Sequence, residues 1–447
     1  MGRRPAIHIS MPAIDLCIRG ATVVLPEGIR KISLAIDQGK VVDHRENEAK
    51  NVVDAEGLTL LPGAVDAHVH YNEPGREEWE GWTTGSRASR AGGATTVIEM
   101  PLNALPPTLD ADSFSKKRAV AEKKSCVDFA LWGGITPLNL GKLPELAHAG
   151  VIGFKAFMVD SGTPDFPGSD PATLKQGMSA AAKLGLPVAV HAESPDPIRH
   201  RTEEIRHKGG TSVRDYLSSR PIETELEAIR LACELAGETR CRLHIVHVSC
   251  PEGIDEIQKA RRAGVDVTAE TCPHYLVLTD EDMVRIGTPA KCAPPLRSAT
   301  AQRGLLQKIH QGEVHTIGSD HSPSPPSMKA DPDFFNVWGG IAGCQHMIPL
   351  LFSAGLSPTQ IARLTSENPA RRFGLYPRKG SLEIGSDADF LLVRTGVTDE
   401  VRAQDLLTTH PITPYLGIKL SARVEQVAVR GCFQPTAGQF LAPLLSQ

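Results

Sequence analysis

The 447-residue sequence has no long hydrophobic run, no secretory leader pattern and no block of like charge. No stretch approaches the roughly 20 apolar residues that cross a membrane. The first ten residues include basic groups but neither an apolar segment nor a small-residue cleavage site. The net charge of −4, from 48 basic and 52 acidic residues, is spread along the chain. These absences argue against nucleic-acid and membrane partners, and we expect a cytoplasmic protein.

Closely spaced cysteine pairs are also missing. The nine cysteines are scattered, odd in number and without a CxxC pair. This usage suits reduced thiols in a cytosolic protein, so no disulfide framework is expected. The hydrophobic fraction of 41% and the charged fraction of 22% are ordinary for an enzyme with a large buried core.

Short β-type runs punctuated by glycine and proline occupy both ends of the chain. Three runs between Ile14 and Leu61 predict a small antiparallel sheet. This sheet is too small to close a core alone, and runs of the same character recur at Gly380–Arg394 and Ala422–Gly431. We therefore predict one β-sandwich built from both termini, with a large insert between them. The predicted division is an extension expected to be disordered (1–12, with Met11 as an alternative start), the N-terminal half of the β-sandwich (13–62), a metal-dependent (β/α)8 barrel (63–377), and the C-terminal half of the β-sandwich with the C-terminal tail (378–447).

The insert alternates apolar, β-branched runs with helix-like stretches. Two of the helical stretches, Glu223–Gly237 and Gly253–Gly264, end on a glycine, as helix C-termini prefer. Eight strands with crossover helices predict an α/β fold of the (β/α)8 TIM barrel type, and a doubly wound open sheet is the alternative. The eight predicted strands are Ala64–His70, Ala94–Met100, Val127–Gly133, Val151–Met158, Pro187–Glu193, Leu243–Ser249, Val265–Cys272 and Val314–Asp320.

Two histidines one residue apart end the first predicted strand. Residues i and i+2 of an extended chain point to the same face, so His68 and His70 project into one small volume. This is a geometry suited to binding a metal. A pair of packed or solvated histidines is the alternative for an isolated HxH pattern.

Other strands of the predicted barrel also carry polar residues at their C-terminal ends, where barrel enzymes place their active sites. Each residue alone is weak evidence, because a lone histidine there is more often a hydrogen-bonded core residue. Four histidines and one aspartate exceed the three protein ligands that one catalytic zinc uses, so we predict two metals. The convergent residues are His68, His70, Lys155, His191, His247 and Asp320.

Lys155 occupies the position where a second carboxylate would be expected. A buried lysine beside cations loses its proton easily, and a neutral amine can add CO2 to form a carbamate that bridges two metals. A plain ion-pairing lysine and a Schiff-base lysine are the alternatives.

Eight motifs of the sequence resemble those of the amidohydrolase superfamily, and within it the cyclic amidohydrolases, closest to the branch that acts on allantoin. The similarity runs from about residue 14 to residue 440. It implies a (β/α)8 barrel with a composite β-sandwich and a binuclear metal centre bridged by a carboxylated lysine and a hydroxide. The motifs are HVHYNEPGR, AGGATTVIEMPLN, GFKAFM, HAE, HIVHVS, ETCPHYL, KCAPPLR and GSDHSP.

The resemblance also implies roles for individual residues. His68, His70, carboxylated Lys155 and Asp320 would hold one metal, and Lys155, His191 and His247 the other. Asp320 would in addition be catalytic, moving a proton from the attacking water to the leaving nitrogen. His244 lies three residues before His247, so strand alternation predicts that it faces the other way, and we interpret it as structural.

Differences between this sequence and those of related enzymes narrow the range of expected substrates. Dihydroorotases typically have an arginine two residues after the second histidine, where this chain has Asn72. Dihydropyrimidinases and hydantoinases typically have a tyrosine just beyond the lysine strand, and the segment AFMVDSGTPDF has none. Asn103 and Ser322 match positions thought to bind substrate in allantoin-hydrolysing enzymes. Helix capping or turn formation would also explain an Asn and a Ser at these positions.

We therefore expect hydrolysis of the small molecule allantoin to allantoate. A hydantoinase or dihydropyrimidinase is the alternative enzyme, and a non-catalytic scaffold homologue is the alternative from another class. The expected cofactors are two divalent ions per subunit, zinc by default with cobalt or manganese as alternatives, and a CO2-derived carbamate on Lys155. We also expect the protein to form a homo-oligomer, specifically a homotetramer.

Overall fold

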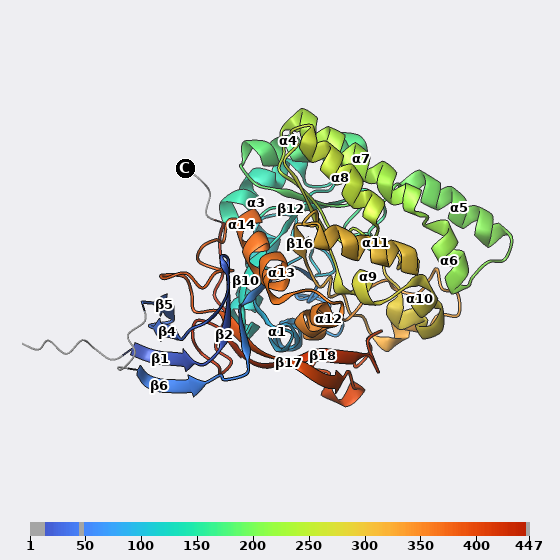
Figure 1. Cartoon of the computed structure of the whole chain (residues 1–447). Coiled ribbons are helices and arrows are strands. Elements are labelled where there is room, and N and C mark those ends of the chain that lie inside the picture. The colour runs from blue at the N-terminus through green and yellow to red at the C-terminus, as the bar shows by residue number, and fades with distance from the viewer. Residues whose placement is uncertain (1–13, 44–48, 444–447) are drawn as a thin grey trace, which may run out of the picture.

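The computed structural model describes residues 14–43 and 49–443. The predicted N-terminal extension (1–12) and the alternative start at Met11 lie outside the described residues. Two β-sheets lie on one side of a barrel, and helices α5 (Pro195–His207) and α6 (Val213–Ser219) lie on the opposite side (Figure 1).

The barrel strands follow one another in chain order, and every neighbouring pair is parallel. β10 and β11 are two segments of the third strand, separated by Trp132. The eight strands are β8 (Ala64–Val69), β9 (Ala94–Glu99), β10 (Asp128–Leu131) with β11 (Gly133–Gly134), β12 (Phe154–Phe157), β13 (Val188–His191), β14 (Leu243–Ile245), β15 (Val267–Thr271) and β16 (Thr316–Ile317).

The barrel closes between its first and last strands. The His70 N–H donates to the His321 carbonyl at 2.7 Å, and Val69 forms a parallel bridge with His321. An open doubly wound sheet has its first strand in the middle and does not pair it with its last strand. The predicted (β/α)8 barrel is therefore confirmed, and the open-sheet alternative is wrong.

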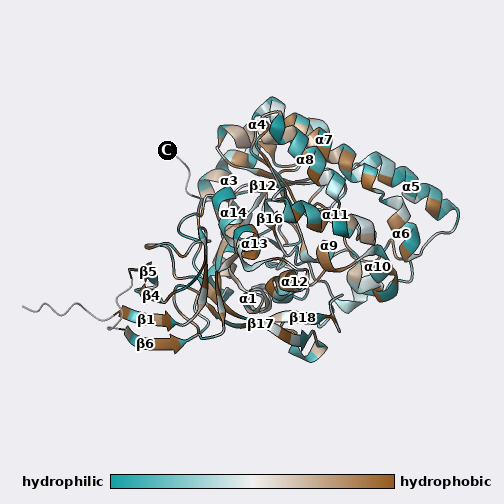
Figure 2. Ribbon diagram, viewed as in Figure 1, coloured by the Kyte–Doolittle hydropathy of each residue, from teal (hydrophilic) through white to brown (hydrophobic). Residues whose placement is uncertain are grey.

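Helices surround the strands, and hydrophilic and hydrophobic residues alternate along them (Figure 2). The pattern is expected of helices that bury one face against a sheet. Besides α5 and α6, the α-helices are α1 (Trp82–Ala91), α2 (Ala111–Lys124), α3 (Leu143–Ala149), α4 (Pro171–Lys183), α7 (Ile222–Thr239), α8 (Pro251–Arg262), α9 (Pro273–Val277), α10 (Asp280–Ile286), α11 (Ala299–His310), α12 (Met347–Ser353), α13 (Pro358–Ala362) and α14 (Asn368–Arg372). Short helical turns are η1 (Leu140–Lys142), η2 (Thr288–Ala290), η3 (Pro326–Lys329), η4 (Cys344–His346), the π-helical η5 (Arg363–Glu367) and η6 (Ala403–Asp405).

The two helices predicted to end on glycine end differently. After α8, Gly264 takes a φ of 91°, the left-handed conformation that glycine adopts without a Cβ clash. α7 instead continues through Gly237, and Arg240 takes the left-handed conformation, with a φ of 56°. The predicted end at Gly237 is therefore wrong, because tertiary packing extends the helix past a weak helix former.

Strands from both termini form the two sheets beside the barrel. In the larger sheet, Leu391 of β17 pairs with Leu61 of β7 in antiparallel register, which confirms the predicted composite β-sandwich. This sheet has the order β18 (Lys419–Ala428), β17 (Phe390–Glu400), β7 (Thr59–Pro62), β2 (Thr22–Leu25) and β3 (Gly28–Lys31). The smaller sheet has the order β5 (Lys40–Val42), β4 (Leu34–Asp37), β1 (Ile14–Arg19) and β6 (Ala49–Asp54).

The sequence predicted an antiparallel sheet for the N-terminal strands, but two of their pairings are parallel. β1 pairs with β6, and β2 with β7, in parallel register. Consecutive strands joined by tight turns are antiparallel, such as β4 and β5, where Gln38 and Gly39 both have positive φ, and β1 and β4 also pair in antiparallel register. Parallel pairing needs a longer connection, and the intervening strands of the other sheet provide it here.

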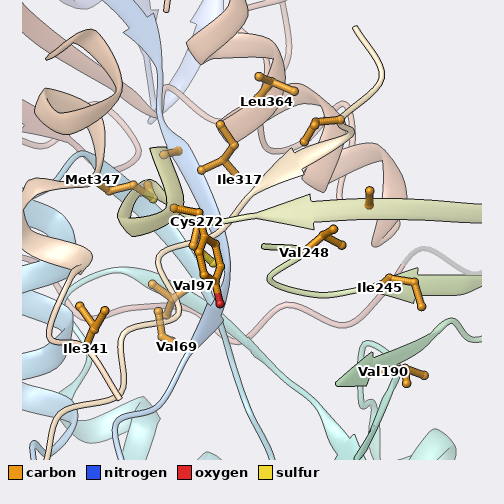
Figure 3. Packing of buried hydrophobic residues seen from close by; sticks show 14 of the residues in the cluster. Val69, Val97, Val190, Ile245, Val248, Cys272, Ile317, Ile341, Met347 and Leu364 are labelled. Atoms are coloured by element: carbon orange, nitrogen blue, oxygen red, sulfur yellow. The ribbon is translucent and has the colours of Figure 1, made fainter. Parts of the chain in front are cut away.

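Barrel strands place alternate residues on their two faces. Figure 3 shows part of the buried hydrophobic cluster on the outer face of the strands, where strand residues pack with residues of α12 and η5. The labelled members include Val190, Ile245, Ile317, Met347 and Leu364. Strand alternation then turns Lys155 and His191 to the barrel interior.

Candidate metal centre

The six convergent residues lie at or just after the C-terminal ends of five barrel strands. His68 lies in β8, Lys155 in β12, and His191 ends β13. The other three follow their strands: His70 comes directly after β8, His247 two residues after β14, and Asp320 three residues after β16. The fold therefore brings all of them to the end of the barrel where such enzymes carry their chemistry.

Three of these residues form a group that could hold a metal ion. The ligand atoms of His68, His70 and Asp320 lie within 4.8 Å of one another. Asp320 Oδ1 is 3.2 Å from Nε2 of His68 and 3.6 Å from Nε2 of His70. Two imidazoles and one carboxylate are a donor set typical of catalytic zinc.

The remaining two histidines lie beside this group. The ring centroids of His191 and His247 are 4.6 Å apart, and those of His247 and His68 are 5.4 Å apart. His247 Nδ1 is buried and has no hydrogen-bond partner among residues 14–43 and 49–443. A second set of imidazole donors is thus available next to the first.

Lys155 is fully buried at the same place. Within the described part of the chain its Nζ atom has no hydrogen-bond partner. It lies 4.5 Å from the ring centroid of Phe157, which stacks on His191 at 4.6 Å. A buried ammonium without partners is costly. The environment therefore favours a neutral or chemically modified amine at this position.

A cavity of about 710 Å³ opens over these residues. Among the described residues, its lining includes His68, His70, His191, His247 and Asp320, but not Lys155. Lys155 thus lies beneath the cavity surface.

Burial controls the charge of the histidines and of Lys155. It lowers the pKa of His70 to about 4, although a hydrogen bond with Asp320 opposes the effect, and it lowers the pKa values of His191 and His247 too. Burial also lowers the pKa of Lys155 to about 7. Metal ligands must be deprotonated, and neutral imidazoles meet this requirement near neutral pH.

Asp320 is shifted so that it stays ionised. Burial alone would raise its pKa, but the neighbouring charges of His68 and His247 and the hydrogen bond with His70 lower it below the ordinary range. The orphaned nitrogens of Lys155 and His247, the neutral imidazoles and this carboxylate together fit a pair of divalent cations.

Strained backbone gathers at the cavity. Seven non-glycine residues of the described chain have positive φ, and four of them, Asn72, Asn103, His247 and Asp320, occur in or beside this group. Their φ values run from 41° for His247 to 67° for Asn103. Such residues cost about 1–3 kcal/mol each and cluster at functional sites.

Two carboxylates that the sequence did not assign as ligands support the histidines. Glu270 Oε1 lies 2.7 Å from His68 Nδ1, and Glu193 Oε2 lies 2.7 Å from His191 Nε2. Glu193 also accepts a hydrogen bond from Arg220 at 2.7 Å. The sequence signal for Glu193 is its place two residues after His191, on the same face of an extended chain.

His244 is connected to the same group. Its Nδ1 lies 2.8 Å from Thr268 Oγ1, and its Nε2 lies 3.5 Å from the second oxygen of Glu270. Strand alternation, from which we predicted that His244 faces away from His247, does not apply here, because β14 ends at Ile245 and His247 has a φ of 41°. His244 supports Glu270, which in turn contacts His68.

The three expected substrate-side positions differ in their surroundings. Asn103 and Ser322 line the cavity, and Asn103 Nδ2 lies 3.5 Å from His70 Nδ1. Asn72 is fully buried, donates to the Pro323 carbonyl at 3.4 Å, and does not line the cavity in the described portion of the chain. Asn72 therefore replaces the dihydroorotase arginine without placing an amide at the cavity surface.

Cavity-lining residues from long connections were missed by the sequence analysis. They include Arg220 before α7, Lys291 after η2, and residues 335–340. No periodic pattern marks them, because they lie outside regular strands and helices.

Comparisons with known proteins agree with this geometry. The model of the amidohydrolase family matches residues 59–432. Proteins named allantoinase from Rubrobacter xylanophilus and Solibacter usitatus are 50% and 47% identical to this chain, over 94% and 93% of each chain respectively. The solved structure of the L-hydantoinase (dihydropyrimidinase) from Arthrobacter aurescens has a TM-score of 0.93 and 32% identity, and covers 96% of this chain and 100% of its own. The dihydropyrimidinase structure from Brevibacillus agri has a TM-score of 0.89 and 28% identity, over 96% of this chain and 99% of its own. This chain, with its histidines, lysine and aspartate gathered at one end of the barrel, belongs to the amidohydrolase family and is a cyclic amide hydrolase.

Proposed function

We propose that this protein hydrolyses allantoin to allantoate. Water adds to a ring carbonyl, the ring C–N bond breaks, and the products are a carboxylate and a free ureido nitrogen. The observation that carries the proposal is the convergence of His68, His70, His191, His247 and Asp320 on one cavity. Identities of 46–50% to three proteins named allantoinase, over 93–94% of this chain, favour this substrate.

A hydantoinase or dihydropyrimidinase is the second candidate. The high TM-scores of 0.93 and 0.89 to structures with these names favour it. Their identities of 32% and 28% are lower than those of the allantoinases. The segment after β12, which lines the cavity at Val159–Gly162, contains no tyrosine of the kind that those enzymes typically carry.

The proposed cofactors are two divalent cations, zinc by default, with cobalt or manganese as alternatives. His68, His70 and Asp320 would hold one, His191 and His247 the other, and a carboxylated Lys155 both. When bound, they supply Lewis acidity that polarises the ring carbonyl and makes water nucleophilic near neutral pH.

We propose that Lys155 carries a carbamate. A neutral amine forms an N–C bond to CO2 and releases one proton, which gives an anion with two oxygen donors. The buried, unpartnered Nζ among the predicted ligand positions supports this, as does the pKa of about 7. The ion-pairing alternative has little support, since no carboxylate partner within 4 Å is found for Lys155 among the described residues.

Asp320 is the proposed proton carrier. It takes a proton from the attacking water and donates it to the ring nitrogen, which leaves poorly unless protonated. Asn103 and Ser322, on the cavity surface, are the proposed hydrogen-bonding partners of the substrate. Amide and hydroxyl groups match a neutral ureido arm better than an arginine would.

A cytoplasmic location and a homotetramer remain proposals. The first rests on the scattered cysteines and the missing leader pattern, and the second on the resemblance. In the described ranges, no helix has both the length and the apolar character needed to cross a membrane.

A substrate panel tests the proposed function. Metal-replete protein is assayed with allantoin, hydantoin, dihydrouracil and dihydroorotate, beside Asp320→Asn protein purified in parallel to detect contaminating activity. We expect allantoin to exceed the others by orders of magnitude in kcat/KM, because a site built for polar ureido groups leaves its own partners unpaired with analogues that lack them. Comparable rates on dihydrouracil would favour the second candidate.

A further inference from the structure

One wall of the cavity is a loop without regular secondary structure, and Arg206 of α5 donates to the side chains of Asp333 and Asn336 in it at 2.8 and 2.9 Å. We call residues 333–340 the wall loop. All but its first two residues line the cavity: Phe335, Asn336, Val337, Trp338, Gly339 and Gly340. The position of this wall therefore depends on what holds the main chain of the loop.

Lys291 holds the loop from inside. Its side chain is buried, and Nζ donates to the carbonyls of Phe334 at 2.6 Å, Phe335 at 3.1 Å and Val337 at 2.5 Å. Its own carbonyl accepts from the Gly340 N–H at 2.7 Å. An ammonium has three donors, and all three are used on this one loop.

A second buried lysine completes the attachment. Lys329 Nζ donates to the carbonyls of Trp338 at 2.9 Å and Gly340 at 2.8 Å. Five carbonyls of the loop are thus bound by two ammonium groups. Burying an ammonium against carbonyls rather than carboxylates is costly, because no negative charge offsets the loss of water. Neutral donors would be enough for a loop that has only a structural role.

The loop also touches a predicted substrate-binding residue. A Cβ added at Gly340, where φ is 149°, would lie 2.2 Å from the Ser322 carbonyl and 2.9 Å from Ser322 Oγ. The Ser322 N–H donates to the Ile341 carbonyl at 2.9 Å, directly after the loop. Because Gly340 and Ser322 pack without spare space, a shift of the loop must move Ser322, which lies two residues after Asp320.

We propose that Lys291 is a positioning residue that sets the wall loop, and through Gly340 the position of Ser322, for substrate binding. The inference rests on the proposed function for the identity of the substrate. Lys291 lines the cavity, but its three donors are used on the wall loop, and among the described residues it has no hydrogen bond to a predicted metal ligand. Its loss should therefore weaken substrate binding more than it slows the chemical step.

The test is Lys291→Met, with Lys175→Met as the matched control. Lys175 lies on α4, is 53% exposed and pairs with Glu238. We expect kcat/KM for allantoin to fall about 10²-fold in Lys291→Met, the scale of a misplacement of about 1 Å, with most of the loss in KM. Metal content should equal that of the wild type, and the control should match the wild type in both constants. A loss of folded protein would instead lower the apparent kcat and leave KM unchanged.

Hydrogen exchange of the wall loop gives a readout that does not depend on activity. Amides of residues 333–340 should exchange faster in Lys291→Met than in the wild type and the Lys175→Met control, without substrate. Unchanged exchange, or faster exchange with an unchanged KM, would overturn the proposal. If Lys291→Met does not fold, Lys291→Arg replaces it, and a raised KM is again expected because a planar guanidinium cannot match three convergent carbonyls.

The proposed function and this inference fail in different ways. If the wild type does not open allantoin, the proposed function is wrong, and the KM comparison is made with whichever cyclic amide of the panel is hydrolysed. If the wild type opens allantoin and Lys291→Met keeps the wild-type KM, only the role of Lys291 is wrong.

Discussion

His68 Nδ1 lies 2.7 Å from Glu270 Oε1, while Nε2 of the same ring lies 3.2 Å from Asp320. The second oxygen of the Glu270 carboxylate lies 3.5 Å from His244 Nε2. Burial would raise the pKa of Glu270, but His68 and His244 lower it to about 2, so it is ionised. The carboxylate fixes the proton of His68 on Nδ1 and leaves Nε2 free to bind a metal.

Glu270→Gln should therefore weaken metal binding without removing a predicted ligand. We expect metal affinity to fall about 10–100-fold, as is typical when such supporting partners are lost. The measurement is metal content after dialysis against graded chelator concentrations. Glu238→Gln, on the exposed surface of α7, is the control and should retain metal like the wild type. If Glu270→Gln retained metal as well as the wild type does, His68 would not need the Glu270 carboxylate to bind metal.

The portion of the candidate site that lies on regular strands was predictable from sequence. His68, Lys155 and His191 belong to β8, β12 and β13, and strand alternation alone turns the last two inward. The barrel itself followed from eight apolar runs, because parallel strands buried on both faces are nearly continuously hydrophobic.

Residues beyond the strand ends were not predictable in the same way. His247 and Asp320 adopt left-handed φ values of 41° and 47°, which no local pattern indicates and which tertiary contacts must impose. The same holds for Lys291, whose three acceptors lie more than 40 residues further along the chain. Asp320 was expected at the end of the eighth predicted strand and again from the family resemblance, whereas Lys291 begins the motif KCAPPLR but received no role from the sequence.

Lys155→Ala tests the proposed bridge. Removing the amine removes the carbamate, so we expect lower metal content and loss of most activity. A small carboxylate added to the buffer should restore some of both, because it can occupy the space that the side chain leaves. Metal analysis and turnover with and without the carboxylate are the measurements, and Lys175→Ala treated in the same way is the control. Near-normal turnover in Lys155→Ala would exclude a bridging role.

Lys379→Met should destabilise the fold. Lys379 is fully buried and binds Asp128 at the start of β10, Asp387 at 2.9 Å and Asp389 at 2.8 Å, so it joins the barrel to the β-sandwich. Its loss leaves the buried Asp389 carboxylate without a cationic partner, whereas Arg430 still pairs with Asp128, and Lys40 and Arg378 still pair with Asp387. A buried charge left unpaired costs about 3–5 kcal/mol. Urea unfolding at pH 7 measures the free energy, and Lys31→Met, in an exposed pair with Glu56, should change it little.

The pH dependence of that cost follows from the pKa shifts. Burial would lower the pKa of Lys379, but the three aspartates raise it, so its stabilisation is complete below about pH 10 and lost as pH rises through the folded-state value. Burial would raise the pKa of Asp387, but Lys379 lowers it, so its stabilisation is present above about pH 4 and lost in stronger acid. The loss of unfolding free energy in Lys379→Met should therefore be largest between about pH 4 and pH 10. If this loss of unfolding free energy stayed constant down to pH 3, it would not come from the ion pairs of Lys379.

Asp320 is expected to carry the proton as well as to bind metal. It is the only carboxylate among the six convergent residues, and its low pKa keeps it ionised and ready to accept a proton. Loss of activity alone cannot separate the two roles, because a ligand that only holds metal is equally essential. The informative variant is Asp320→Asn, whose amide oxygen can still bind a cation but cannot carry a proton.

The comparison requires Asp320→Asn with the same metal content as the wild type, verified on the protein used for kinetics. Under that condition we expect kcat to fall about 10²-fold or more, the scale of general acid–base contributions. Any acidic limb of the pH–rate profile that comes from protonation of Asp320 should also disappear, because an amide does not titrate there. Asp112→Asn, at the exposed start of α2, controls for the substitution itself. If fully metallated Asp320→Asn kept wild-type turnover with the acidic limb intact, another group would have to move the proton, and Asp320 would be a metal ligand alone.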